Sequence, residues 1–220
     1  MIEGYGVTEE YIGAPIKSSM EVKLIGQTED GKPVYIDKHA AEADGIIVMG
    51  RVKPHTSFRG KYESGLMKMM AIGLGKHKGA EVCHAEGFKN MAYNVTSFAK
   101  AILKNANILF GIAIIENAYD ETYKISALTK EEIPEEEPKL LIEAKRLMPE
   151  IKFDSFDILI VDRIGKNISG DGMDPNITGI YATPYASGGP KLKSCVVLDL
   201  TDETHGNALG IGLANFTTKR

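Results

Sequence analysis

The chain has 220 residues, of which 43% are hydrophobic and 25% are charged, and its formal net charge is −4. These proportions are typical of globular proteins and exclude a disordered or fibrous chain, and the length suits one domain plus part of another. There is no apolar run near the roughly 18 residues of a membrane span and no signal-peptide pattern at the N-terminus, so we expect a cytoplasmic protein. The two cysteines, Cys83 and Cys195, argue against a disulfide framework and against a thiolate zinc site.

Short apolar runs alternate with helical stretches along the chain. The predicted strands are 21–25, 45–50, 108–115, 157–161 and 195–200, and the predicted helices are 37–43, 64–72, 89–104 and 138–147. Continuous apolar strands are typical of parallel sheets, which are buried on both faces, and the alternation indicates βαβ units. We therefore predict an α/β fold, with a Rossmann-like parallel sheet covered by helices on both faces and part of a second α/β domain.

A domain boundary is expected near residues 149–153, between a charged helix and an apolar strand. This assigns 1–150 to the C-terminal part of a first domain and 151–220 to the start of a second. The turn-rich run 165–176 follows a predicted strand, and ligands of open α/β sheets bind beyond the carboxyl ends of strands. That run is a second candidate site, although an ordinary surface connection explains it equally well.

Positive charge is concentrated in one segment of the chain. From Arg51 to Lys78 there are seven basic residues and a single acidic one, Glu63. A basic island in an acidic chain indicates a local anion site better than a nucleic-acid surface, so we expect no nucleic-acid partner. A solvated basic loop would have the same composition, and the neighbouring residues must decide between the two.

Two features inside the island suit an anionic ligand. Lys68 lies in an apolar helical stretch, where desolvation would lower its pKa and make the neutral amine accessible. A lysine whose stem lies on apolar surface while its ammonium reaches water is the alternative interpretation. Gly73, Gly75, Lys76 and Lys78 combine closely spaced glycines with lysines, a composition that can approach and neutralise a phosphate. The pattern is neither a Walker motif nor a dinucleotide fingerprint, so the phosphate signal is weak by itself.

Three of the five histidines, His55, His77 and His84, also fall within this part of the chain. Imidazole suits nickel, copper, zinc and iron, but no carboxylate or thiolate set accompanies these residues at zinc spacing. A metal held mainly by an organic ligand, with one histidine completing its coordination, fits the pattern better. Zinc or iron held by His55 and His84 together with Asp171 or Asp174 is the alternative.

The central segment resembles the lactate racemase family, whose members bind a nickel-pincer nucleotide derived from nicotinic acid. The resemblance rests on a histidine, a glycine-rich turn, a lysine and a second histidine, with a 15-residue gap between Lys68 and His84 as in the family. It implies that His55 acts as acid/base, that Lys68 tethers the nucleotide and that His84 coordinates nickel. The gap between His55 and Lys68 is about three residues longer than the family's, with the extra length in 59–63. Phrases such as those at 55–60, 63–68 and 165–176 resemble an uncharacterised branch of the family along essentially the whole chain.

The resemblance implies racemisation or epimerisation of a small 2-hydroxy acid by reversible hydride transfer to the pincer. The protein would then be an isomerase, with Gly73, Gly75, Lys76 and Lys78 holding the nucleotide. Arg59 and Lys61 are the candidates for pairing with the substrate carboxylate, and an arginine is the better bidentate partner.

Two departures from the family bear on activity. Family members carry an upstream segment with a Gly-x-His motif, so we expect this chain to be a fragment that is inactive alone. A Tyr, a Gln and a Lys of the family's second domain are replaced by Thr178, Gly179 and Ala182, so the substrate is not expected to be held as lactate is. A phosphate- or nucleotide-binding module without nickel and a zinc or iron enzyme of other activity are the alternative functions. Roles for His39 and His205 and the oligomeric state do not follow from the sequence.

Overall fold

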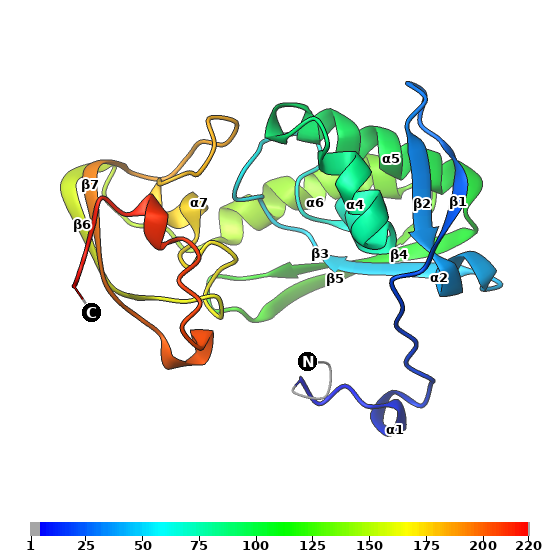
Figure 1. Ribbon diagram of the computed structural model, residues 1–220, viewed down its shortest axis with the longest axis horizontal. Helices are drawn as coiled ribbons and strands as arrows, with labels where there is room; N and C mark the ends of the chain where they lie inside the picture. The colour runs from blue at the N-terminus through cyan, green and yellow to red at the C-terminus, as the bar shows by residue number, and fades with distance from the viewer. Residues whose placement is uncertain (1–4, 220) are drawn as a thin grey trace.

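The computed structural model describes residues 5–219 and has an α/β fold, as predicted (Figure 1). The helices are α1 (Glu9–Ile12), α2 (Lys38–Glu42), α3 (Leu66–Lys68), α4 (Lys76–His84), α5 (Met91–Asn105), α6 (Ile133–Leu147) and α7 (Pro175–Thr178), with a π-helix at Met69–Leu74 and 3-10 turns at Phe88–Asn90, Asp202–Thr204 and Ile211–Leu213. The strands are β1 (Val22–Gln27), β2 (Pro33–Asp37), β3 (Ile46–Arg51), β4 (Ile108–Glu116), β5 (Thr122–Thr129), β6 (Ser155–Ile164), β7 (Lys191–Leu200) and β8 (Phe216–Thr217).

The strands form three small sheets rather than one. The hairpin of β1 and β2 is antiparallel; the second sheet has the order β3-β4-β5, in which β3 and β4 are parallel and β5 is antiparallel. The third sheet, β6-β7-β8, is parallel throughout. The expected parallel pairing therefore holds for β3 with β4 and for β6 with β7, while β2 and β5 add antiparallel partners that were not predicted.

Helices α3 and α6 pack on one face of the β3-β4-β5 sheet, and α5 packs against α3 and the π-helix. In Figure 1 the helices α5 and α6 lie on the same side of this sheet. On the other face Ile47, Met49, Leu109 and Ile125 are exposed. The apolar strands predicted helices on both faces of the sheet. Among residues 5–219, helices cover only one face of the β3-β4-β5 sheet. No helix in this range has the length and apolar character to cross a membrane.

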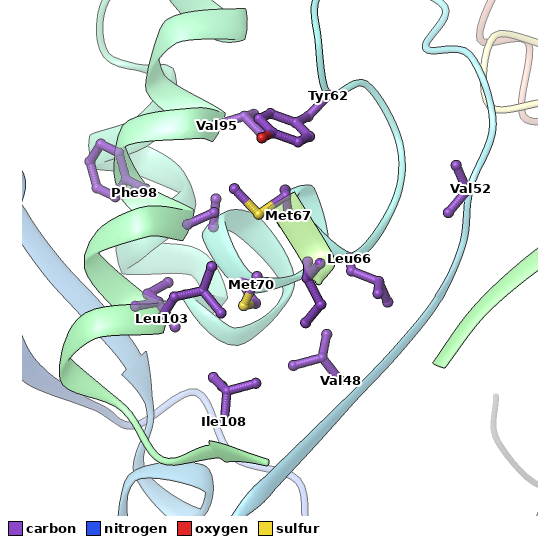
Figure 2. Close-up of a cluster of buried hydrophobic side chains, with 14 of the residues drawn as sticks. Val48, Val52, Tyr62, Leu66, Met67, Met70, Val95, Phe98, Leu103 and Ile108 are labelled. Carbon is purple, nitrogen blue, oxygen red and sulfur yellow. The ribbon is translucent and has the colours of Figure 1, made fainter. Parts of the chain in front are cut away.

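The main hydrophobic core lies between this sheet and its helices (Figure 2). Met67 and Met70 project from the α3 and π-helix segment into this core, to which α5 contributes Phe98, and all three side chains are buried. Because Met67 and Met70 are anchored on the inside, the intervening Lys68 and Met69 lie nearer the surface. The core thereby determines the direction in which Lys68 leaves its helix.

A smaller core forms around Ile164, Met173, Cys195 and Val197 in the C-terminal part. In Figure 1 this part, with β6, β7 and α7, lies apart from the helices of the main core, and α6 extends toward it. The two cores have separate sheets. The division at residue 150 remains a prediction.

Candidate functional site

His55 lies on the loop that follows β3, at the carboxyl end of the strand. Its backbone N–H donates to Glu63 Oε2 at 2.8 Å, and its Nδ1 accepts from the Ser57 N–H at 3.0 Å. Because Nδ1 is an acceptor, the neutral ring carries its proton on Nε2. Burial, followed by the positive charges of Lys68 and Arg59, lowers the pKa of His55 from 6.5 to about 3. At neutral pH the ring is therefore uncharged, with Nε2–H as a hydrogen-bond donor.

Lys68 is the last residue of α3 and directly precedes the π-helix, a rare element that is frequent at functional sites. Burial lowers the pKa of Lys68 from 10.5 to about 8, with an opposing effect of Cys83 and a further lowering by Lys53. At pH 7 about a tenth of such amines are neutral, far more than for an ordinary lysine. The lysine is thus closer to the desolvated, nucleophilic case than to the solvated alternative.

His84 is the last residue of α4 and is exposed. Its Nδ1 lies 2.7 Å from the Ala80 carbonyl oxygen, so Nδ1–H donates and Nε2 keeps its lone pair. A backbone carbonyl on one ring nitrogen is the usual support of a histidine that binds metal through the other.

The three predicted residues are brought close together. The charges of Lys68 and His84 both lower the pKa of His55, after burial as the largest cause. The ring of Phe88 has its centroid 6.5 Å from that of His55 and 6.3 Å from that of His84. Two imidazoles and an amine from the β3 loop, α3 and α4 therefore share one region, with Phe88 as an apolar neighbour of both rings.

A pocket of about 310 Å³ opens beside Lys68. Its lining includes Lys53, Ser64, Gly65 and Gly73, so it joins the end of β3 to the π-helix. Neither imidazole lines this pocket. Of the predicted nucleotide-binding residues, Lys68 and Gly73 are the two at this pocket.

Arg59 has a different environment from the one expected of a substrate-binding residue. Its guanidinium donates to the His55 carbonyl oxygen at 2.6 Å and, through Nη2, to Asn176 Oδ1 at 2.5 Å and Tyr181 Oη at 2.9 Å. The Ser187 carbonyl oxygen accepts from both Nε and Nη2. These contacts link the His55 loop to the end of the 165–176 run and the chain beyond it. The guanidinium is thus occupied within the protein.

The other predicted cations also have protein partners. Lys61 is exposed, with its Nζ 5.3 Å from the centroid of the Tyr62 ring. Lys76 pairs with Asp37 at 3.3 Å, and Lys78 lies over the ring of Tyr35, 4.7 Å from its centroid. Lys76 and Lys78 therefore attach α4 to β2 and lie apart from the residues that line the Lys68 pocket.

Gly75 and Gly79 serve helix packing in this arrangement, because the run with the weak phosphate signal is the end of the π-helix and the start of α4. A Cβ on Gly75 would lie 2.8 Å from the Ala71 carbonyl oxygen and 3.1 Å from the Gly79 Cα. A Cβ on Gly79 would lie 3.4 Å from the Tyr35 carbonyl oxygen. Glycine is thus required at position 75 by close backbone contact.

Replacing Gly75 by alanine is expected to lower the free energy of unfolding by about 1 to 3 kcal/mol, because the clash is with backbone atoms that cannot move away. Gly170→Ala is the matched control, since a Cβ there meets nothing within 4 Å. Urea unfolding of both variants measures the difference. Equal stabilities would show that position 75 has room for a side chain.

Glu63 holds the loop that carries His55 in place. In the sequence it stood out only as the single acidic residue between Arg51 and Lys78. Its carboxylate is fully buried and accepts from Lys145 Nζ at 2.7 Å and from Arg59 Nη1 at 3.3 Å, in addition to the His55 amide. The loop that carries His55 is thereby fixed to α6. Two charges and an amide satisfy this one carboxylate.

The metal question depends on the donors present. Among the described residues no group of three or more His, Cys, Asp or Glu side chains could hold a metal ion. A zinc or iron site built by His55 and His84 with Asp171 or Asp174 is therefore not formed in this part of the chain. His84, with its free Nε2, fits a metal that takes its remaining ligands from an organic group.

The run 165–176 is ordered by its own contacts. Lys166 Nζ donates to the Gly170 carbonyl oxygen at 2.7 Å, and Asp174 caps the N-terminus of α7 by accepting from the Asn176 N–H at 2.8 Å. Its connection to the candidate site is the bond from Asn176 to Arg59.

Comparison with known proteins adds the family. Residues 9–95 match the family model of the lactate racemase N-terminal domain. This segment is therefore similar to the lactate racemase N-terminal domain, and it makes up less than half of the chain. The resemblance expected from the sequence is confirmed, and His55, Lys68 and His84 all lie inside the matched segment, whereas the second candidate run, 165–176, lies outside it.

The chain is also similar in structure to the lactate racemase apoprotein from Thermoanaerobacterium thermosaccharolyticum. The TM-score is 0.50 at 19% sequence identity, over 83% of this chain and 43% of that one. At this identity the likeness concerns the fold, and this chain spans less than half the length of that protein. No curated protein matches the chain.

Proposed function

We propose that this chain carries the cofactor site of a lactate racemase-like isomerase that racemises or epimerises a small 2-hydroxy acid in the cytoplasm. The observation that carries the proposal is that His55, Lys68 and His84 lie in one region of a segment that matches the lactate racemase N-terminal domain. The match to this domain supports racemase-type chemistry, and the cofactor and residue roles are our proposal.

The donor chemistry of these residues fits a nickel-pincer nucleotide. Lys68 would supply the tethering amine, since its lowered pKa leaves a neutral nucleophile accessible near neutral pH. His84 would supply one ligand through Nε2, as its Nδ1–H is held by the Ala80 carbonyl. When bound, the cofactor would supply a carbon that accepts and returns a hydride.

His55 would hold a proton at Nε2 beside the reacting centre. In this protonation state it would donate a hydrogen bond to a ligand oxygen and orient the hydroxyl or carbonyl of the substrate, without transferring its proton. To accept the hydroxyl proton at Nε2, the ring must first carry its own proton on Nδ1 instead, and this requires that Nδ1 release the Ser57 amide. His55 is thus better prepared in this protein to donate than to accept.

The test of the tether uses this chain and the nickel-pincer nucleotide. After incubation, peptide mass spectrometry is expected to find the adduct on Lys68, and Lys68→Ala is expected to lose both adduct and retained nucleotide. Lys89→Ala, at an exposed position, is the control. Equal retention by Lys68→Ala and the unmodified chain would end the tether proposal.

The metal role is tested on protein purified without a metal-affinity tag. His84→Ala is expected to lose bound nickel after loading with the nucleotide, whereas His77→Ala, exposed on the same helix, is expected to keep it. Elemental analysis measures the nickel content. Equal nickel in both variants would remove His84 from the coordination sphere.

The sequence predicted that Arg59 or Lys61 pairs with the substrate carboxylate, and the proposal does not give them this role. The hydrogen bonds of Arg59 to the His55 loop and to Asn176 support a role in holding the loop in place. Lys53, which lines the Lys68 pocket, is the cation better placed to meet an anionic group of the ligand. The partners of Lys76 and Lys78 on β2 give the alternative of a phosphate-binding module little support.

A further inference from the structure

A second buried carboxyl group lies behind Lys68. Glu137 of α6 is only 1% exposed, and its Oε2 accepts from the Met67 N–H at 2.9 Å. Its Oε1 has no hydrogen-bond partner among residues 5–219. Burial raises the pKa of Glu137 to about 7, against the lowering effect of the Met67 and Leu66 amides. The hydrogen bond that this buried, ionisable side chain makes is thus to the start of helix α3.

The local sequence is adapted to this carboxyl group. Gly65 precedes α3 and has no side chain to cap the helix. A Cβ at this position would lie 2.4 Å from Glu137 Oε1, so only glycine leaves room for the carboxyl group. The free N–H groups at the start of a helix need acceptors, and here the acceptor comes from another helix instead of from the preceding residue.

We propose that Glu137 is a positioning residue for Lys68, because its carboxyl group fixes the start of the helix at Met67 and so sets where the next side chain points. This inference rests on the proposed function, in which Lys68 tethers the nucleotide.

The geometry of the helix explains how the effect is transmitted. Lys68 follows Met67 directly, and Gly65, which Glu137 contacts, lines the same pocket as Lys68. If the Met67 amide lost its acceptor, the first turn would fray, and Lys68 would move into water. The side chains of Leu66 and Met67 before the lysine, and of Met70 and Ala71 after it, lie in the core, so the contribution of Glu137 is to hold the backbone of the first turn.

Helix α6 also supports the opposite side of the site. Its Lys145 binds Glu63, which accepts from the His55 amide. One helix therefore contacts both the segment that carries the amine and the loop that carries the imidazole.

The experiment separates position from charge. Glu137→Gln keeps the length of the side chain and an oxygen acceptor, while Glu137→Asp keeps the charge but withdraws the carboxylate from Met67. The rate of Lys68 acetylation between pH 6 and pH 11, followed by peptide mass spectrometry, gives the pKa of Lys68 in each protein. Hydrogen exchange of the amides in 66–74 reports on the helix start.

We expect Glu137→Asp to raise the pKa of Lys68 by about one unit or more toward its ordinary value of 10.5, and to speed amide exchange about tenfold. Glu137→Gln should leave both unchanged. Glu135→Asp, an exposed position on the same helix, is the control. A folded Glu137→Asp protein with an unchanged Lys68 pKa would overturn the proposal, as would an equal shift in Glu137→Gln, which would assign the effect to charge.

Two further choices keep the result decisive. If Glu137→Asp does not fold, Gly65→Ala replaces it, because the added Cβ displaces the carboxyl group without removing it. The measurement needs no cofactor. If the Lys68 pKa shifts in Glu137→Asp but no nucleotide adduct forms on Lys68, the positioning role is upheld and the proposed function is contradicted. If the adduct forms but the Lys68 pKa does not shift, the proposed function is upheld and the positioning role is contradicted.

Discussion

Replacing Glu63 by leucine is expected to lower the free energy of unfolding by about 3 kcal/mol. The carboxylate is fully buried and accepts from Lys145, Arg59 and the His55 amide. Its removal takes the acceptor away from Lys145 and the His55 amide and removes one of the several acceptors of Arg59. The loss falls at the lower end for a broken buried pair, since the side chains of Lys145 and Arg59 are 39% and 27% exposed and regain some water.

Urea unfolding at pH 7 measures this loss. Glu143→Leu is the matched control, because Glu143 pairs with Lys124 at 2.8 Å on the surface and should cost less than about 1 kcal/mol. A similar loss in both variants would mean that the Glu63 cluster contributes no more than a surface ion pair.

Acid is expected to destabilise the protein through His55. The folded pKa of about 3 lies below the value of 6.5, so below pH 6.5 the unfolded chain binds a proton that the folded protein does not. Stability therefore falls as pH drops through the window from 6.5 to 3. Relative to His55→Gln, the protein should lose on the order of 2 to 3 kcal/mol between pH 7 and pH 4.

The comparison isolates His55 from other titrating groups. Glu137, whose raised pKa favours the folded state at low pH, acts in the opposite direction but is present in both proteins and cancels. His77→Gln, at an exposed position, should follow the unmodified protein at every pH. Parallel stability curves for His55→Gln and the unmodified protein would contradict a buried neutral imidazole.

The spacing of apolar residues in the sequence predicted the helices and strands that face the core. All five expected strands and all four expected helices correspond to strands and helices of the structure, although the 64–72 helix divides into α3 and a π-helix. The strands β2 and β5 were not predicted. Most residues of β5 are exposed, so its pairing with β4 leaves little hydrophobic signal in the sequence.

Partners distant in sequence limited the prediction of the site. Arg59 could not be distinguished from a substrate-binding arginine, because its acceptors Asn176 and Ser187 follow it by 117 and 128 residues. The Gly73 to Gly79 composition gave a weak phosphate signal, whereas glycine is needed at position 75 because the π-helix and α4 approach closely there.

Glu137 left a signal that could have been used. It lies within an acidic run that suits a solvated helix start, yet its position on α6 is on the buried face. The buried residues of the helix are Ile133, Glu137, Leu140, Leu141 and Ala144. A carboxylate at a core position of an amphipathic helix indicates a buried partner.

The contacts of α6 with both sides of the site have a consequence for thermal motion. Glu137 near the start of the helix holds the Lys68 segment, and Lys145 near its end holds the His55 loop. When α6 shifts as a rigid rod, the amine and the imidazole are carried in the same direction, so their separation fluctuates less than the displacement of either one. A ligand that contacts both groups would then meet them at a nearly constant separation, even while the sheet moves.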